Sequence, residues 1–296
     1  MTTVAVVAPS CQAGGDDLRA GIAVLEEEGL RVKVGARSFE DRPHTPEEDA
    51  LRARELEEAM LDPEVDAILC ARGGYGVARL LDFVDWERVA GCDKRFVGYS
   101  DITTLHGILA QRCPHVSRAY GPMAASGMVR SRSPRAEQLH RFLRGEPLGD
   151  ILADLRREEV RVLHPGRTEG TAAGGCLCLV VSTIGTPYQI DTAGKILILE
   201  DINEESRRVD RYLTQLLHAG MLASAAAVVC GRTFCRTDEE DPMATQDEIL
   251  RRYLDPLDVP VLMDVPIGHV DELLTVPLDR PARLEADSGV RTLWFG

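Results

Sequence analysis

The first part of the chain alternates short apolar runs with longer amphipathic stretches, and this alternation constrains the fold more than any other feature. The apolar runs predict strands at residues 3–8, 31–35, 66–70 and 95–98. Helical patterns follow at residues 16–28, from Pro46, after residue 76 and at 101–111. Strands that alternate with helices form right-handed crossover units, so this part predicts a parallel, doubly wound sheet.

The helix that starts at Pro46 has the clearest predicted boundary. Thr45 suits the N-cap position, Pro46 suits the first helical position, and Glu48 completes a capping box. These three residues together indicate a helix start without reference to the rest of the chain.

From about residue 127 the alternation gives way to charged, proline-containing sequence, which predicts a linker. The later sequence predicts strands at 195–201 and 225–231, helices at 205–218 and 244–253, and further short strands near the end. We therefore expect an N-terminal domain at residues 1–130, a linker at 131–165, and a mixed α/β domain at 166–296.

Composition narrows the partners and the compartment. The formal net charge of -14 and the pI near 5.0 argue against nucleic acid and anionic membranes, which both select basic surfaces. The eight cysteines show no zinc-like spacing, and Cys176-x-Cys178 has no histidine or cysteine at ligand distance in the sequence. With no signal-like start and no membrane-length apolar run, we expect a soluble cytoplasmic protein with reduced thiols and no metal or cofactor.

Several chemically capable side chains follow apolar runs, and ligands of open α/β sheets bind at the carboxyl ends of strands. Ser100 follows "RFVGY", Glu200 closes "KILILE", and His269 follows "DVPIG". The glycine-rich stretch "RGGYG", from Arg72 to Gly76, follows "DAILC". We take these as the candidate functional positions.

Ser100 has two interpretations at this point. A serine on a sharp strand–turn–helix corner is exposed as a nucleophile, with helix N–H groups aimed at the reacting carbonyl. The match to a nucleophile elbow is partial, because Ile102 stands where the second glycine is expected. Alternatively, Ser100 or Asp101 caps the following helix.

His269 suits a general base because imidazole titrates near neutral pH, and the alternative, favoured for an arbitrary histidine, is a surface or packing role. His106 is a rival base on the helix after Ser100. Glu200 could orient an imidazole or cap "DINEES", and Asp201 and Glu204 compete for the orienting role.

The "RGGYG" loop lacks the GxGxxG spacing of a dinucleotide site. Its glycines allow close approach of backbone N–H donors to a ligand, which favours an oxyanion-binding or carboxylate-binding loop. A tight strand-to-helix turn is the alternative.

Seven stretches occur in an order that resembles the LD-carboxypeptidase family of serine peptidases (muramoyltetrapeptide carboxypeptidases), which includes a microcin-immunity branch. They are "VAPS", "ARGGYGVARLLD", "GYSDITTLHG", "GPM", "GTPYQID", "LILEDINEESRRVDRYLTQL" and "PIGHVDELLTVPLD", and they span nearly the whole chain. The resemblance implies a Rossmann-like N-terminal domain, similar to class I glutamine amidotransferases, and a smaller mixed α/β C-terminal domain.

The resemblance also implies a Ser-Glu-His triad of Ser100, Glu200 and His269, with an oxyanion hole formed by the N–H groups of Asp101 and Gly74. Arg72 and Gly73 of the same loop are expected to bind substrate. The implied reaction removes the terminal D-alanine from a bacterial wall tetrapeptide in murein recycling, without metal or cofactor. A homodimer is implied as well.

Three positions depart from the family pattern: Cys176 replaces an asparagine, Tyr120 a histidine, and Arg207 an aromatic residue. They bear on the exact substrate more than on the reaction. One alternative function is cleavage of a peptidyl-nucleotide antibiotic, which calls for an aromatic platform, yet the chain has only Trp86 and Trp294. A non-catalytic Rossmann-type protein that binds a small metabolite is the other alternative.

Overall fold

The computed structural model describes the whole chain except residues 40–42, 132, 237–243, 279 and 288, and the side chain of Arg157. The chain forms two compact units, Met1–Pro147 and Leu148–Gly296. The division falls inside the stretch expected to be a linker. The units are nearly equal in length, so the second is not the smaller one, because residues 148–165 supply strands to its sheet.

The first unit is built on a parallel sheet, which confirms the architecture expected from the alternating pattern. Within this unit the strand order is β5-β4-β3-β1-β2, and every neighbouring pair is parallel. The strands are β1 (Thr3–Val7), β2 (Arg31–Val34), β3 (Ala67–Cys70), β4 (Arg95–Gly98) and β5 (Ser117–Tyr120). Strands β1 and β3 are buried along their whole length, as expected for strands covered on both faces.

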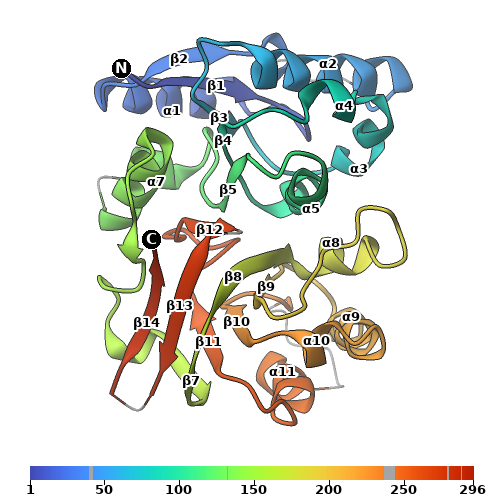
Figure 1. Cartoon of the computed structure of the whole chain (residues 1–296), viewed down its shortest axis with the longest axis vertical. Coiled ribbons are helices and arrows are strands. Elements are labelled where there is room, and N and C mark those ends of the chain that lie inside the picture. Colours follow the sequence, from blue (N-terminus) through green and yellow to red (C-terminus); the bar gives the residue numbers. More distant parts are fainter. Residues whose placement is uncertain (40–42, 132, 237–243, 279, 288) are drawn as a thin grey trace. The chain divides into compact units, whose positions relative to one another are not determined.

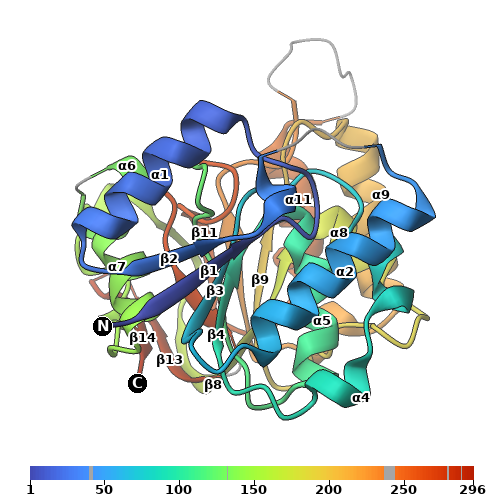
Figure 2. The ribbon, with the colours of Figure 1, turned by 90° about the horizontal axis from the view of Figure 1, so that it is seen from above.

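Helices cover both faces of this sheet, and Figure 2 shows α1 and α2 on opposite sides of it. The helices are α1 (Gly15–Glu27), α2 (Pro46–Leu61), α3 (Val77–Leu80), α4 (Trp86–Val89), α5 (Thr103–Arg112), α6 (Gly127–Arg130) and α7 (Pro134–Arg144). Short 3₁₀ segments lie at Ala36–Ser38, Leu81–Phe83 and Ser100–Ile102. The predicted start of α2 is confirmed, since the Thr45 hydroxyl accepts a hydrogen bond from the Glu48 N–H.

The second unit is built on a mixed sheet with the strand order β6-β14-β13-β8-β9-β10-β11-β7 (Figure 1). Strands β8 to β11 are parallel, and the strands outside them are antiparallel to their neighbours. The bounds are β6 (Gly149–Asp150), β7 (Arg161–His164), β8 (Gly166–Cys176), β9 (Ile196–Glu200), β10 (Ala227–Gly231), β11 (Val261–Val265), β13 (Pro281–Ala286) and β14 (Arg291–Phe295). One further short strand, β12 (Val276–Leu278), belongs to the same part of the chain.

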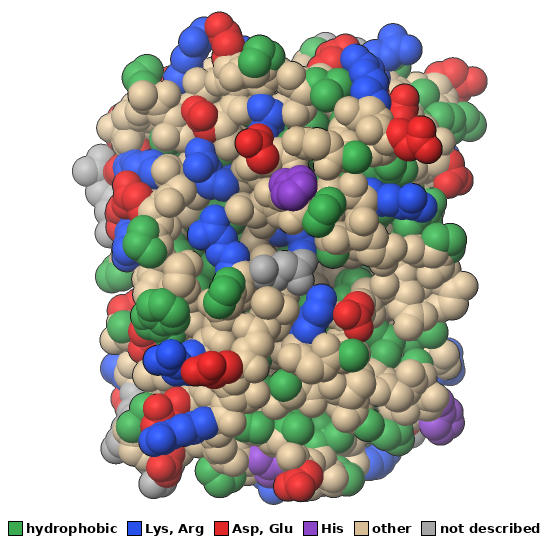
Figure 3. Space-filling model, in the orientation of Figure 1, with side chains coloured by type: hydrophobic (Ala, Val, Ile, Leu, Met, Phe, Trp, Pro, Cys, Tyr) green, Lys and Arg blue, Asp and Glu red, His purple; other side chains and the backbone are tan. Residues whose placement is uncertain are grey.

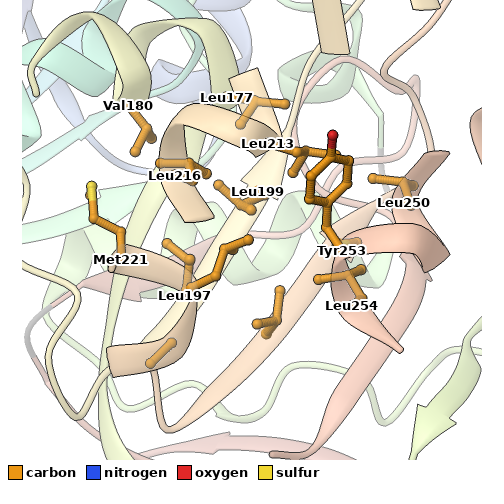
Figure 4. Packing of buried hydrophobic residues seen from close by; sticks show 14 of the residues in the cluster. Leu177, Val180, Leu197, Leu199, Leu213, Leu216, Met221, Leu250, Tyr253 and Leu254 are labelled. Carbon is orange, nitrogen blue, oxygen red and sulfur yellow. The ribbon is translucent and has the colours of Figure 1, made fainter. Parts of the chain in front are cut away.

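A single apolar cluster joins the helices of the second unit to its sheet, as Figure 4 shows. The helices are α8 (Leu177–Ser182), α9 (Ser206–His218), α10 (Met221–Ser224) and α11 (Gln246–Leu254), with a 3₁₀ segment at Arg157–Glu159. Leu197 and Leu199 of β9 meet Leu213 and Leu216 of α9 in this cluster. Burial of such side chains stabilises the unit by roughly 1.5–3 kcal/mol each, and it fixes the position of the C-terminal end of β9.

Strand β8 escapes prediction because its sequence is rich in small and polar residues. The glycines have a steric cause: a Cβ on Gly174 would lie 2.1 Å from the Ile198 carbonyl oxygen, and Gly174 has a φ of +118°. Only glycine lets β8 pass this closely to β9. The usual sequence criteria for a strand, a short apolar run rich in β-branched residues, therefore do not identify β8.

Within the described residues, no helix is both long and apolar enough to cross a bilayer. On the face drawn in Figure 3, acidic and basic side chains are interspersed, and the residues described there form no broad basic patch.

Candidate active site

Ser100 lies at the corner between β4 and the 3₁₀ turn that leads into α5. Its φ is +64°, a left-handed conformation that is uncommon for residues other than glycine. The side chain is half-buried. A serine held in this conformation two residues after a parallel strand has the backbone geometry of a nucleophile elbow.

Backbone contacts hold this corner in place. The Ser100 N–H donates to the Tyr120 hydroxyl at 3.1 Å, and the Thr103 hydroxyl donates to the Ser100 carbonyl at 2.7 Å. Tyr120 is fully buried on β5, the strand beside β4. One of the three departures from the family pattern therefore contacts the backbone of the candidate nucleophile directly.

The helix-cap alternative for this stretch is wrong. Neither the 3₁₀ turn nor α5 has a side-chain cap hydrogen bond at its start. The Asp101 carboxylate instead accepts from the Ser10 hydroxyl at 2.6 Å and from the Val77 N–H at 3.0 Å, at the start of α3. Burial raises the pKa of Asp101, and these hydrogen bonds partly oppose the rise.

Asp101 thus ties the Ser100 corner to the loop that follows β3. Ser10 was not singled out from the sequence, although its place just after the strand that ends at Val7 was the signal that could have identified it. The buried hydrogen bond from Ser10 to Asp101 helps to hold Asp101, and with it the Ser100 corner, in place.

The glycine-rich loop packs against Ser100. A Cβ on Gly73 would lie 2.9 Å from the Ser100 Cβ and 3.1 Å from its Oγ, so a larger residue would displace the serine. Gly74 has a φ of +126°, and its added Cβ would meet the Cys11 sulfur at 2.7 Å. Arg72 is exposed at the start of the loop. The structure therefore places Gly73 against Ser100, with Arg72 and Gly74 on either side of it in the loop.

His106, the rival base, points elsewhere. Its Nε2 lies 2.9 Å from the carbonyl oxygen of Gly98, and the ring is buried. Burial lowers the pKa of His106 to about 3, with a further decrease from the charge of Arg118. The neutral ring donates from Nε2 to the Gly98 carbonyl at the end of β4, and it thereby stabilises the strand end that precedes Ser100.

Glu200 and His269 lie together in the second unit. The Glu200 side chain is fully buried at the end of β9, and its Oε2 accepts from His269 Nδ1 at 2.9 Å and from the His269 N–H at 3.2 Å. Burial lowers the pKa of His269, but the hydrogen bond to Glu200 and the charges of Glu200 and Asp201 raise it by more. The net effect is a pKa above the usual histidine value. The tautomer that donates from Nδ1 carries its lone pair on Nε2.

Two glycines make room for the Glu200 carboxylate. A Cβ on Gly231 would lie 2.6 Å from the Glu200 Cβ, and one on Gly268 would lie 2.0 Å from its Cδ. Gly268 also has a φ of +75°. The end of β10 and the turn before His269 are therefore shaped around this side chain.

The competing carboxylates have other partners. Asp201 accepts from the Cys178 N–H at 2.8 Å and from the Ile202 N–H at 2.9 Å. Glu204 pairs with Arg208 at 3.4 Å. Of the three carboxylates weighed from the sequence, Glu200 is the one that contacts the imidazole of His269.

The other two departures from the family pattern lie in the second unit. Exposed Arg207 forms an ion pair with Glu205 at 2.5 Å. Cys176 ends β8 beside Glu200 in the strand register and donates to Asp201 at 3.4 Å.

Comparison with known protein families defines the class of this protein as a peptidase, and hence a hydrolase. Residues 4–121 match the LD-carboxypeptidase N-terminal domain, and residues 169–284 match the LD-carboxypeptidase C-terminal domain. These matches cover well over half of the chain. The chain belongs to the LD-carboxypeptidase family.

Curated relatives agree with this assignment. The chain is 42% identical to a putative carboxypeptidase of Streptomyces coelicolor, over 98% of this chain and 92% of that protein. It is 30% identical to the murein tetrapeptide carboxypeptidase of Pseudomonas aeruginosa, over 98% and 94% of the two chains. The crystal structure of muramoyltetrapeptide carboxypeptidase from Oxalobacter formigenes has a TM-score of 0.80 and 28% identity, covering 100% of this chain and 99% of that one.

The fold is also shared with the microcin C7 self-immunity protein. Its wild-type structure has a TM-score of 0.84 at 22% identity and covers 99% of this chain and 95% of that one. Identity this low establishes the common fold and no more.

Proposed function

We propose that this protein is a serine carboxypeptidase that removes the terminal D-alanine from L,D-tetrapeptides of the bacterial cell wall. The observation that carries the proposal is the buried Glu200 carboxylate bound to His269 Nδ1, in a chain whose Ser100 follows a parallel strand with a positive φ. Relatives named as murein peptide carboxypeptidases supply the substrate class.

In the proposed reaction His269 Nε2 takes the proton of the Ser100 hydroxyl as Oγ attacks the scissile carbonyl. Glu200 holds the ring in the required tautomer and stabilises the imidazolium that forms. The same proton then passes to the amine of the departing D-alanine, and water releases the acyl group from Ser100 with His269 again acting as base. The nucleophile comes from the first unit and the base from the second.

The N–H groups of Gly74 and Asp101 are the proposed donors to the oxyanion. Both residues lie at the Ser100 corner, and the Asp101 side chain is already occupied by Ser10 and Val77. One such donor is worth about 3–4 kcal/mol of transition-state stabilisation in other serine hydrolases. Arg72 and the neighbouring Gly73 N–H are proposed to bind the free carboxylate of the peptide, because a guanidinium pairs well with that group.

The test is a mass-spectrometric assay of the purified protein with L-Ala-γ-D-Glu-meso-diaminopimelate-D-Ala. We expect release of D-alanine and formation of the tripeptide. Ser100→Ala should abolish turnover and keep the fold. Ser117→Ala on β5 serves as a control that should retain turnover. D-alanine release that persists in Ser100→Ala would remove Ser100 from the mechanism.

A second candidate is cleavage of a peptidyl-nucleotide antibiotic, because the family includes a microcin-immunity branch and the curated microcin C7 self-immunity protein matches over 90% of this chain at 21% identity. The distribution of tryptophans favours the wall peptide: Trp86 lies in α4 and Trp294 in β14, so neither lies in the loops around the candidate residues. We further propose that the protein acts in the cytoplasm as a homodimer. Fractionation and light scattering test these two statements.

A further inference from the structure

Two thiols and a carboxylate meet at the end of β8 and the first turn of α8, and the proposed reaction uses none of them. We call Cys176, Cys178 and Asp201 the thiol–carboxylate cluster. The Cys176 and Cys178 sulfurs lie 3.5 Å apart, and Asp201 Oδ1 lies 3.4 Å from the first and 3.8 Å from the second. The sequence alone offered the two cysteines but gave no sign of the third member.

These three separations match the edges of a tetrahedral metal site. With zinc–sulfur bonds of about 2.3 Å and zinc–oxygen bonds of about 2.0–2.2 Å, a tetrahedron has sulfur–sulfur edges of about 3.8 Å and sulfur–oxygen edges of about 3.6 Å. The ligand atoms all lie within 4.8 Å of one another. A cation placed above the plane of the three ligand atoms, with a fourth ligand on its far side, therefore requires shifts of only a few tenths of an ångström.

The carboxylate is held in place before any cation binds. Asp201 Oδ2 accepts from the Cys178 N–H, and Oδ1 accepts from the Ile202 N–H at 2.9 Å. Asp201 itself follows buried strand β9 directly and is 3% exposed. Hydrogen bonds of this kind orient a ligating carboxylate in metal sites.

We propose that the thiol–carboxylate cluster binds a thiophilic divalent cation of the zinc type. Cys176 Sγ, Cys178 Sγ and Asp201 Oδ1 are the three protein ligands, and water takes the fourth position. Thiolates select zinc-like ions over magnesium and calcium, which prefer oxygen ligands. Cys178 is half-buried, which leaves a route for the ion to enter.

Binding releases protons, because only thiolates ligate. The hydrogen bond to Cys178 raises the pKa of the Cys176 thiol well above its usual value, and burial with the charges of Glu200 and Asp201 raises it further. A cation replaces the two thiol protons, which pass to solvent, and it compensates the negative charge gathered beside Glu200.

A second group of possible ligands in the described residues, Glu28, Glu137 and His140, is a weaker candidate. Its carboxylates already pair with Arg144, at 3.1 Å from Glu28 and 3.3 Å from Glu137, so a bound cation would compete with a guanidinium. That group also contains no sulfur, which allows a spectroscopic measurement to tell the two apart.

The test is a titration of the reduced, tag-free full chain with Co²⁺, followed by Zn²⁺. We expect a thiolate-to-cobalt charge-transfer band in the near ultraviolet with the intense visible bands of tetrahedral cobalt, and their loss on addition of one equivalent of Zn²⁺. Cation binding is read directly and is independent of the peptidase reaction.

Cysteine variants show which residues bind the cation. Cys176→Ser/Cys178→Ser should lose the charge-transfer band, and Cys178→Ser alone, at a half-buried position, provides a milder change if the double variant fails to fold. Cys235→Ser, at another half-buried cysteine of the same unit, should keep the band. A wild-type protein without the band, or a band of equal intensity in folded Cys178→Ser, would overturn the proposal.

Discussion

Ser100 occupies a left-handed backbone conformation, and its own N–H is bound by a side chain from the adjacent strand. A left-handed serine costs roughly 1–2 kcal/mol relative to an ordinary conformation, so the surrounding contacts must hold it there. Tyr120, Thr103 and Asp101 supply those contacts. At the residue scale, the corner is maintained by hydrogen bonds that the motif "GYSD" alone does not reveal.

The Glu200–His269 contact predicts the pH dependence of turnover. The base must be neutral to accept a proton, and its pKa lies above the usual histidine value because of Glu200. The acidic limb of kcat/KM in the wild type should therefore fall at a pH above that usual value. Glu200→Gln removes the charge, so the limb should move to lower pH while the rate at the plateau decreases. An unchanged limb in a folded variant would contradict this role of Glu200.

Tyr120→Phe tests whether the hydrogen bond to the Ser100 N–H positions the nucleophile. Loss of the hydroxyl should reduce kcat by about tenfold, equivalent to about 1.4 kcal/mol, with little change in KM. Tyr253→Phe is the matched control, because its hydroxyl also makes a hydrogen bond, to the Asp210 carboxylate at 2.8 Å, but in the second unit. The control should lower the melting temperature without lowering kcat. Equal effects of both variants on kcat would reduce Tyr120 to a structural role.

At the scale of elements, regular strands and helices with clear boundaries were predictable, whereas strands shaped by steric demands were not. Thr45 and Pro46 identify the start of α2 because capping chemistry is local. Strand β8 was not predicted because its glycines are required by the close approach of β9, and local sequence does not encode that contact. The candidate residues at strand ends were found, but Ser10 and the Asp201 ligand position depend on tertiary neighbours.

The turn between β11 and His269 provides an element-scale prediction. Gly268→Ala places a methyl group 2.0 Å from the Glu200 Cδ and also strains a residue with a φ of +75°. We expect a loss of about 2–4 kcal/mol in the free energy of unfolding and a strong loss of activity. Thermal melts and turnover assays measure the two effects.

Gly185→Ala is the control for that substitution. Gly185 has a φ of +78° and nothing within 4 Å of its added Cβ, so only the conformational cost of about 1 kcal/mol remains. Turnover should be preserved. If Gly268→Ala were no more harmful than Gly185→Ala, the close fit of Gly268 around Glu200 would be irrelevant to the site.

At the scale of the whole molecule, the proposed chemistry is divided between two units of nearly equal length. In Met1–Pro147, Ser100 lies two residues after strand β4. In Leu148–Gly296, Glu200 is the last residue of strand β9, and His269 lies in the loop after β11. Each unit holds its own part rigidly: the Ser100 corner by Asp101 and Tyr120, and the imidazole by Glu200. Neither unit contains a complete triad, so activity is expected to require the intact chain.

Labelling with a fluorophosphonate tests this division of the triad. The probe phosphonylates a serine only when a base activates its hydroxyl, so the wild type should be labelled at Ser100, as shown by peptide mass spectrometry. His269→Ala, a change in the other unit, should slow labelling of Ser100 by at least about 100-fold. His164→Ala, at a half-buried histidine of β7, should leave the labelling rate unchanged. Rapid labelling of Ser100 in His269→Ala would show that another group activates the serine, and His269 would then lose its assigned role as the base.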